Sequence, residues 1–140
     1  MPASNTNRSR PFDRTRHDHA SETAEDYVEA IAEMIAKKDI CRGADLAKLF
    51  GVSHVTVTKT INRLRRESLV DAEPYRPIRL TSKGKRLAKA TRRRHEIVLS
   101  FLKSLGVSEA VATTDSEGIE HHVSDETLKA FQRFVQSRDA

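Results

Sequence analysis

The chain has 140 residues, of which 37% are hydrophobic and 32% are charged, so it is long enough for one domain, or for one domain with a small appendage. No run approaches the roughly 18 apolar residues that a membrane span needs, and the N-terminus has no apolar stretch typical of a secretory signal. The single cysteine, Cys41, excludes an intramolecular disulfide and thiolate-rich zinc or iron–sulfur sites, which favours a cytoplasmic protein.

The net charge of +5 conceals a strong asymmetry along the chain. Residues 51–95 contain thirteen basic and three acidic residues, which gives this block a net charge of +10. Residues 21–50 carry −3 and residues 96–140 carry −4. One basic block therefore lies between two acidic ones. This order indicates a surface that binds a polyanion in the middle of the chain and a different role for the flanks.

The first part of the chain changes from a polar segment to a helical pattern. Residues 1–20 lack apolar periodicity, so we predict a disordered arm that cannot bury enough surface to offset the entropy of ordering. Ser21 can cap a helix, in which apolar residues recur on one face to about Lys38. A short second helix is predicted at residues 43–50.

The next segment has the pattern of a helix-turn-helix. Gly51 permits a sharp turn after the short helix, and Ser53 can cap a third helix that continues to about Glu67. In this third helix an apolar stripe at i, i+4 and i+7 is expected to face the core. The stripe consists of Val57, Ile61 and Leu64.

The rest of the chain predicts a small β-wing and more helices. Residues 69–72 and 78–80 read as two short strands around a turn that contains proline. Three helices are expected after them, one from Thr81 or Ser82 to about Leu105 and two that begin at Ser108 and Ser124. This order predicts a mainly α fold with a small β-wing, a winged helix-turn-helix.

The outer face of the third predicted helix carries side chains suited to DNA. Four basic residues and no acid lie between His54 and Arg66, and residues 76–95 contain nine basic residues and no acid. Such side chains reach phosphates and base edges in a major groove, although a solvated basic face is the alternative. Few aromatic residues are available for stacking on RNA bases, so duplex DNA is favoured. The candidate DNA-binding residues are Ser53, His54, Thr56, Thr58, Lys59, Asn62, Arg63, Arg76, Arg79 and Lys83.

The acidic flanks contain a candidate metal site. Two acids at i, i+3 share a face of the first predicted helix, and two acids and a histidine at i, i+3, i+4 share a face near residue 120. A further histidine ends the basic run. This oxygen-rich set without sulfur suits Mn(II) or Fe(II), but spacing alone leaves open that these are solvated acids and structural histidines. The groups are Asp26 with Glu29, Glu117 with Glu120 and His121, and His95.

Three stretches resemble a known protein family. They are residues 25–31 (EDYVEAI), residues 80–85 (LTSKGK) with Arg94-His95-Glu96 beyond them, and residues 115–124 (DSEGIEHHVS). Through them, roughly residues 21–138 resemble the diphtheria toxin repressor family, and within it the short branch of manganese-dependent regulators of manganese transport. The resemblance implies a homodimer that binds double-stranded operator DNA and represses manganese-uptake genes when Mn(II) is plentiful.

The resemblance also implies a set of ligands. Iron-responsive relatives place softer sulfur ligands where this chain has Asp26 and Glu117, so Mn(II) is favoured, with Fe(II) as the alternative and Zn(II) expected to bind in vitro. We predict three parts, which are an arm at 1–20, a DNA-binding domain at 21–90 and a metal-binding and dimerisation domain at 91–140. The implied ligands are Asp26, Glu29, His95, Glu117, Glu120 and His121.

Other classes of protein fit the sequence less well. An iron-responsive regulator and a metal-independent winged-helix regulator are the alternatives. A dimetal carboxylate enzyme would need Glu-x-x-His pairs on two helices, which are missing, and no Ser/His/Asp set or phosphate-binding glycine loop is recognisable. We therefore expect a protein that is not an enzyme, without a small-molecule substrate and without a membrane partner.

Overall fold

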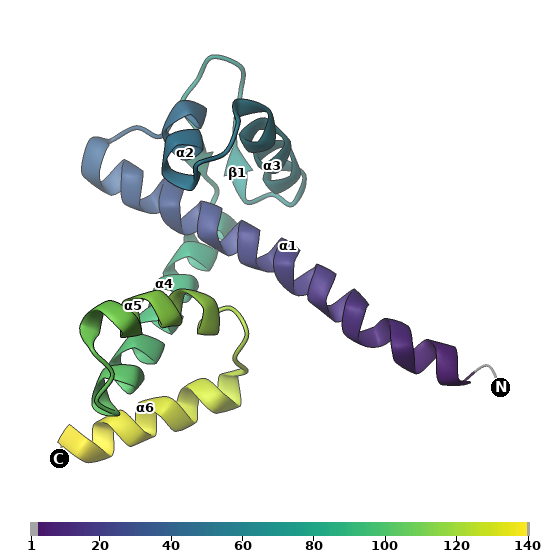
Figure 1. Ribbon diagram of the computed structural model, residues 1–140. Helices are drawn as coiled ribbons and strands as arrows, with labels where there is room; N and C mark the ends of the chain where they lie inside the picture. The colour runs from purple at the N-terminus through teal and green to yellow at the C-terminus, as the bar shows by residue number, and fades with distance from the viewer. Residues whose placement is uncertain (1–2, 140) are drawn as a thin grey trace. The chain divides into compact units, whose positions relative to one another are not determined.

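A computed structural model describes residues 3–139 of the chain, with side chains described from His19 onward. The mainly α fold with a small β-wing is confirmed in this part of the chain. None of the helices described is both long and apolar enough to cross a membrane. The elements are α1 (Ala3–Lys38), α2 (Gly43–Phe50), α3 (His54–Arg66), β1 (Val70–Asp71), β2 (Arg79–Leu80), α4 (Ser82–Ser104), α5 (Glu109–Ile119) and α6 (Asp125–Asp139) (Figure 1).

The chain divides into two compact units. One is Thr23–Ala90, which holds the end of α1, then α2, α3 and the two strands, and the start of α4. The other holds α5, α6 and the rest of α4, together with α1 up to Glu22. Because α4 is one continuous helix, it contributes residues to both units.

The unit at Thr23–Ala90 packs α1, α2 and α3 around an apolar core. Val28 and Ile31 of α1, Leu46 of α2 and Leu64 of α3 are fully buried in it. Burying one such side chain stabilises the fold by about 1.5–3 kcal/mol relative to exposure. The core thus fixes the orientation of α3, whose opposite face stays exposed.

The turn between α2 and α3 forms as the sequence predicts. Gly51 adopts a left-handed conformation with φ of 64°, and its N–H donates to Ala47 O. Ser53 caps α3, because its Oγ accepts a hydrogen bond of 3.2 Å from Thr56 N. The predicted apolar stripe on α3 is also confirmed, since Val57, Ile61 and Leu64 are all buried.

The β-wing is shorter than predicted. Strands β1 and β2 are antiparallel and pair only Val70 with Leu80 and Asp71 with Arg79. Ile78 was expected to belong to the second strand, but its N–H donates to Cys41 O at 2.8 Å and so leaves the ladder.

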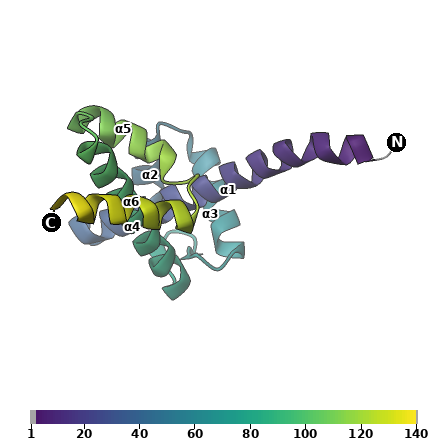
Figure 2. The ribbon, with the colours of Figure 1, turned by 90° about the horizontal axis from the view of Figure 1, so that it is seen from below.

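The second unit packs α5 and α6 against α4 (Figures 1 and 2). Phe101 of α4 stacks on Phe131 of α6 at 3.9 Å between ring centroids and meets Phe134 edge-on at 5.5 Å. Ser108 and Ser124 begin α5 and α6 as predicted, because each hydroxyl accepts a backbone N–H of the following turn.

The N-terminal segment differs from the expectation. The backbone is helical from Ala3, in place of the disordered arm predicted for residues 1–20 and the helix start predicted at Ser21. Apolar periodicity predicts only helices that bury one face. A polar extension of a helix has no such pattern and is therefore missed. Adding residues to an existing helix also avoids the cost of nucleation.

Candidate metal centre and nucleic-acid interface

An imidazole and two carboxylates meet where α4 and α5 pack together. His95 lies on α4, Glu117 on α5, and Glu120 directly after α5. His95 Nδ1 is 2.8 Å from Glu120 Oε2 and 3.8 Å from Glu117 Oε1. One ligand atom from each residue lies within 4.8 Å of those of the other two. Small side-chain shifts would bring all three to the distances that a single divalent cation requires.

The cluster runs from the interior to the surface. The Glu120 side chain is only 1% exposed, that of His95 is 19% exposed, and that of Glu117 is 59% exposed. His95 Nδ1 and Glu120 Oε2 lie at hydrogen-bonding distance, and the tautomer of the imidazole decides which of them donates. A buried carboxylate is costly unless it is paired, which makes this position favourable for a positive charge.

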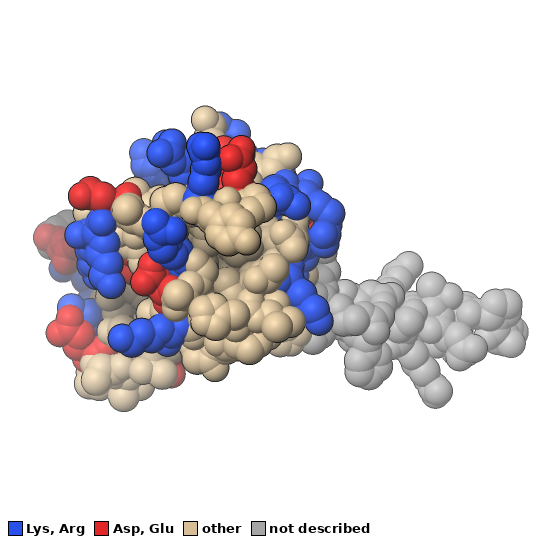
Figure 3. Space-filling view, turned by 90° about the horizontal axis from the view of Figure 1, so that it is seen from above, with Lys and Arg blue, Asp and Glu red and all other residues tan. Residues whose placement is uncertain are grey.

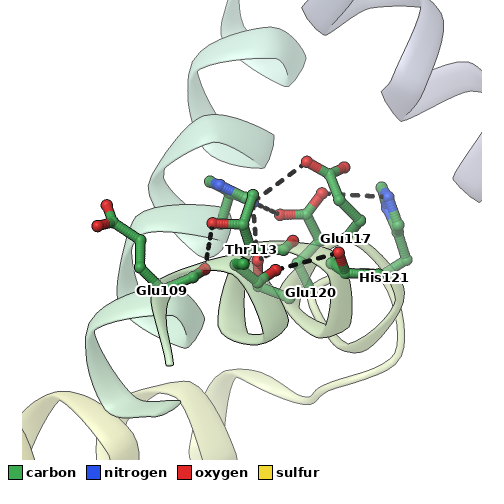
Figure 4. Close-up of polar contacts among 9 residues, drawn as sticks. Glu109, Thr113, Glu117, Glu120 and His121 are labelled. Carbon is green, nitrogen blue, oxygen red and sulfur yellow. Dashed lines mark hydrogen bonds and ion pairs between the residues drawn. The ribbon is translucent and has the colours of Figure 1, made fainter. Parts of the chain in front are cut away.

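His121 places a second imidazole beside the buried carboxylate. Its Nε2 lies 3.3 Å from Glu120 Oε1, and its side chain is 1% exposed. Glu117, Glu120 and His121 gather at the C-terminal end of α5, as Figure 4 shows. The donor set in this place contains two carboxylates and two imidazoles and no sulfur, which is the chemistry of a site for a divalent cation such as Mn(II) or Fe(II).

The structure brings together the four predicted ligands of the second unit. These are His95, Glu117, Glu120 and His121. The other two predicted ligands, Asp26 and Glu29, lie one turn apart on α1 in the unit Thr23–Ala90, and both are half-buried. That all six bind the same metal site stays a prediction.

The N-terminal half of α3 presents a polar surface with exposed side chains. The predicted DNA-binding residues Ser53, His54, Thr56, Thr58 and Lys59 are exposed, and Asn62 and Arg63 are half-buried. Figure 3 shows Lys and Arg side chains in several groups on one face of the molecule, beside Asp and Glu side chains and uncharged surface. This arrangement offers hydrogen-bond donors and positive charge to a DNA groove.

A pocket of about 560 Å³ lies beside the wing. Arg65 Nη1 donates to Ala72 O at 3.3 Å, and Arg76 Nε is 3.5 Å from the Glu73 carboxylate. Three guanidinium groups against two carboxylates give the pocket a net positive lining, which suits a phosphate oxygen. The charged residues of the lining are Arg65, Arg76, Arg79, Asp71 and Glu73.

Comparison with known proteins adds independent information about both sites. Residues 19–78 match the iron dependent repressor N-terminal DNA binding domain, and residues 81–139 match the iron dependent repressor metal binding and dimerisation domain. The transcriptional regulator MntR of Escherichia coli O6:H1 is 44% identical over 129 residues, which cover 92% of this chain and 83% of that protein. The chain belongs to the iron-dependent repressor family.

Further relatives agree with this membership. MntR of Bacillus subtilis is 38% identical over 112 residues, which cover 80% of this chain and 79% of that protein. A manganese-dependent transcriptional repressor solved in complex with manganese is 31% identical with a TM-score of 0.71, and the manganese regulator SloR is 27% identical with a TM-score of 0.71. Each match covers 81% of this chain, which spans about half of those solved chains.

The comparisons bear on the sequence-based predictions. The predicted resemblance to this repressor family is confirmed, and so is the winged-helix fold class. The relatives are described as transcriptional regulators, which also supports the prediction that this chain is not an enzyme.

Three residues at these sites were not predicted. Ser116 is fully buried, and its Oγ lies 3.4 Å from His95 Nδ1 while donating to Thr113 O at 2.9 Å. Its only signal in the sequence is the i, i+4 spacing to Glu120. Arg65 lines the wing pocket, and Val55 is an apolar side chain that is 64% exposed at the start of α3.

Lys83 was predicted to bind DNA, and the structure gives it a partner within the protein. Its Nζ donates a hydrogen bond of 2.9 Å to Glu67 O, just after the C-terminal end of α3. The predicted wing residues Arg76 and Arg79 are exposed.

Cys41 is fully buried in the core of the Thr23–Ala90 unit of this repressor. Burial, and to a lesser extent the charge of Asp45, raises the pKa of its thiol from 9.0 to about 11. The protein is therefore expected to react with iodoacetamide at pH 8 at least about a hundredfold more slowly when native than when denatured, because the thiolate is the nucleophile. Mass spectrometry over time measures this. Equal rates would contradict the buried, protonated thiol.

Proposed function

We propose that this chain is a manganese-activated transcriptional repressor that binds double-stranded operator DNA as a homodimer in the cytoplasm and represses manganese-uptake genes. The observation that carries the proposal is the cluster of His95, Glu117 and Glu120, in a chain of this repressor family whose α3 exposes a basic, polar face. The proposal extends to this chain what the names of its relatives say of them.

The donor set fits a divalent cation of the manganese type. One further carboxylate and two imidazoles gather around the buried Glu120, and we propose that Asp26 and Glu29 of α1 complete the set. When bound, the cation would supply positive charge that neutralises the crowded carboxylates. Carboxylate-rich sites without sulfur favour Mn(II) over thiophilic metals, and Fe(II) is the alternative occupant.

The predicted ligands come from both compact units, so metal binding could change the affinity for DNA. Asp26 and Glu29 belong to the unit that contains α3, whereas His95 and Glu117 belong to the other. An ion held by both groups would favour one arrangement of the recognition helices in the dimer, for half-sites about one DNA turn (~34 Å) apart. The energetic requirement is that the metal binds the DNA-competent arrangement more tightly than any other.

We propose that α3 reads the operator in the major groove. Ser53, His54, Thr56, Thr58, Lys59, Asn62 and Arg63 would contact bases and phosphates there, and Arg76 and Arg79 of the wing would contact phosphates. Base contacts then provide sequence specificity, and phosphate contacts provide most of the affinity and its dependence on salt.

A metal titration tests this function. Duplexes selected from a random pool by the Mn(II)-loaded protein serve as operators, and fluorescence anisotropy measures affinity with Mn(II), with Fe(II) under anaerobic conditions, and after chelation. Mn(II) is expected to raise operator affinity by about 5- to 150-fold. Sedimentation velocity measures the expected dimer. Equal affinity with Mn(II) and after chelation would contradict metal control, and a larger effect of Fe(II) would favour the iron-responsive alternative.

A further inference from the structure

The start of α4 is bonded to the turn that follows α3. Thr81 caps α4, because its Oγ1 accepts a hydrogen bond of 3.0 Å from Gly84 N–H. The same hydroxyl donates to Ser68 O at 2.6 Å, and the N–H of Thr81 donates to Leu69 O at 3.1 Å. One residue thus joins the first turn of α4 to the chain that leaves α3.

Lys83 adds a third bond at the end of α3 itself. Its Nζ donates to the carbonyl oxygen of Glu67, the residue that caps the C-terminus of α3. The last carbonyls of a helix have no partner within the helix and form the negative end of its dipole. A lysine ammonium at this position satisfies one such carbonyl and compensates the dipole.

The position of the Lys83 ammonium is poorly suited to reading an operator. Helix α3 has 13 residues, so it is about 20 Å long, and Lys83 meets it at the end opposite to Ser53 and His54. The Glu67 carboxylate is also at that end, 3.9 Å from Arg63 Nε, and its charge would repel a phosphate. The bond between Lys83 and Glu67 is therefore better suited to holding α3 in place than Lys83 is to binding DNA.

We propose that Lys83 is a positioning residue, which together with Thr81 fixes the C-terminal end of α3 to the start of α4. Helix α4 also carries His95 of the candidate metal centre, twelve residues further along the same helix. The attachment transmits the position of α4 to the recognition helix. This inference rests on the proposed function, because it assumes that α3 reads an operator whose binding depends on metal.

Three variants separate positioning from phosphate contact. Lys83→Met removes the ammonium and keeps most of the apolar stem, Lys83→Arg keeps a charged donor, and Lys85→Met removes the same charge from an exposed side chain on the same helix. Anisotropy with operator and non-operator duplexes, each over a series of salt concentrations with Mn(II) and after chelation, gives affinity, salt dependence and metal dependence. Thermal unfolding at one protein concentration shows that each variant is folded.

Lys83→Met is expected to lower operator affinity in Mn(II) by about two- to thirtyfold, as for changes in a coupling element. Its affinity for non-operator DNA and the slope of log K against log salt should equal those of the wild type. The factor by which Mn(II) raises its operator affinity should be smaller than in the wild type. Lys83→Arg should restore operator binding. Lys85→Met should change operator and non-operator affinity by the same factor.

Two results would overturn the inference. One is a parallel loss of operator and non-operator affinity in Lys83→Met, with a salt slope shallower by about one, which is the signature of a lost phosphate contact. The other is a Lys83→Met variant whose operator affinity equals that of the wild type and is raised by Mn(II) by the same factor. If Mn(II) does not raise the operator affinity of the wild type, the proposed function fails. The positioning role is then still tested by whether Lys83→Met loses affinity for operator DNA and keeps its affinity for non-operator DNA.

Discussion

Replacing Glu120 with glutamine is expected to abolish the metal dependence of operator binding. The Glu120 carboxylate is buried between His95 and His121, at 2.8 Å and 3.3 Å from their ring nitrogens. Glutamine keeps the shape and removes the charge that a cation would neutralise. The gain in operator affinity from Mn(II), expected to be about 5- to 150-fold in the wild type, should fall to about one in Glu120→Gln.

Two measurements check this result. Anisotropy gives the operator affinity with Mn(II) and after chelation, and the electron paramagnetic resonance signal of free Mn(II) gives metal binding without DNA. Both the metal binding and the gain in affinity should be lost together, whereas binding to non-operator DNA should persist, because α3 and the wing are unchanged.

A matched control lies at the start of α5, the helix that Glu120 follows. Glu109 begins α5, its side chain is 77% exposed, and its carboxylate is 3.8 Å from Lys103 Nζ. Glu109→Gln removes the same charge from α5 and should leave metal binding and operator affinity as in the wild type. Mn(II) binding of wild-type strength in Glu120→Gln would show that the cluster is a structural hydrogen-bond network and not a metal site.

The exposed face of α3, the candidate DNA-binding face, was predictable because it follows from local rules. Gly51 and Ser53 mark a turn and a cap that depend on only a few neighbouring residues, and the apolar spacing of Val57, Ile61 and Leu64 assigns the buried face of α3. Once that face is buried, the opposite side chains must be exposed. The sequence could not show that Lys83 bonds to Glu67, since that contact depends on how α4 meets α3.

The metal centre was predictable in part, for a different reason. Glu117, Glu120 and His121 share one end of α5 by helical spacing, but nothing local places His95 beside them. That residue was a candidate from its place at the end of the basic run, the family resemblance added it to the implied ligands, and the packing of α4 on α5 supplies the contact. The position of Ser116 beside His95 was not predicted, because no sequence pattern distinguishes a buried serine at a site from one that only packs in the core. Asp26 and Glu29 remain predicted ligands, since they lie in the other compact unit.

Gly84→Ala is expected to destabilise the Thr23–Ala90 unit strongly. A Cβ at Gly84 would lie 2.0 Å from Leu69 O and 3.2 Å from Leu80 Cδ2. The first neighbour is backbone and cannot rotate away, so α4 must move relative to Leu69, the residue before β1, and the bonds made by Thr81 must stretch. Overpacking of this kind costs about 1–3 kcal/mol or more, although alanine is the better helix former.

Thermal unfolding measures this cost, and a second glycine provides the control. For a unit of 60–100 residues, each kcal/mol lowers Tm by about 4–8 °C. A Cβ at Gly118, in α5, would have no neighbouring atom within 4 Å, so Gly118→Ala should stabilise the protein by about 0.4–1 kcal/mol. Operator affinity should fall in Gly84→Ala, because the displaced α4 no longer holds the end of α3. A Tm for Gly84→Ala equal to or above that of the wild type would show that α4 and Leu69 are not in the close contact on which the positioning of α3 depends.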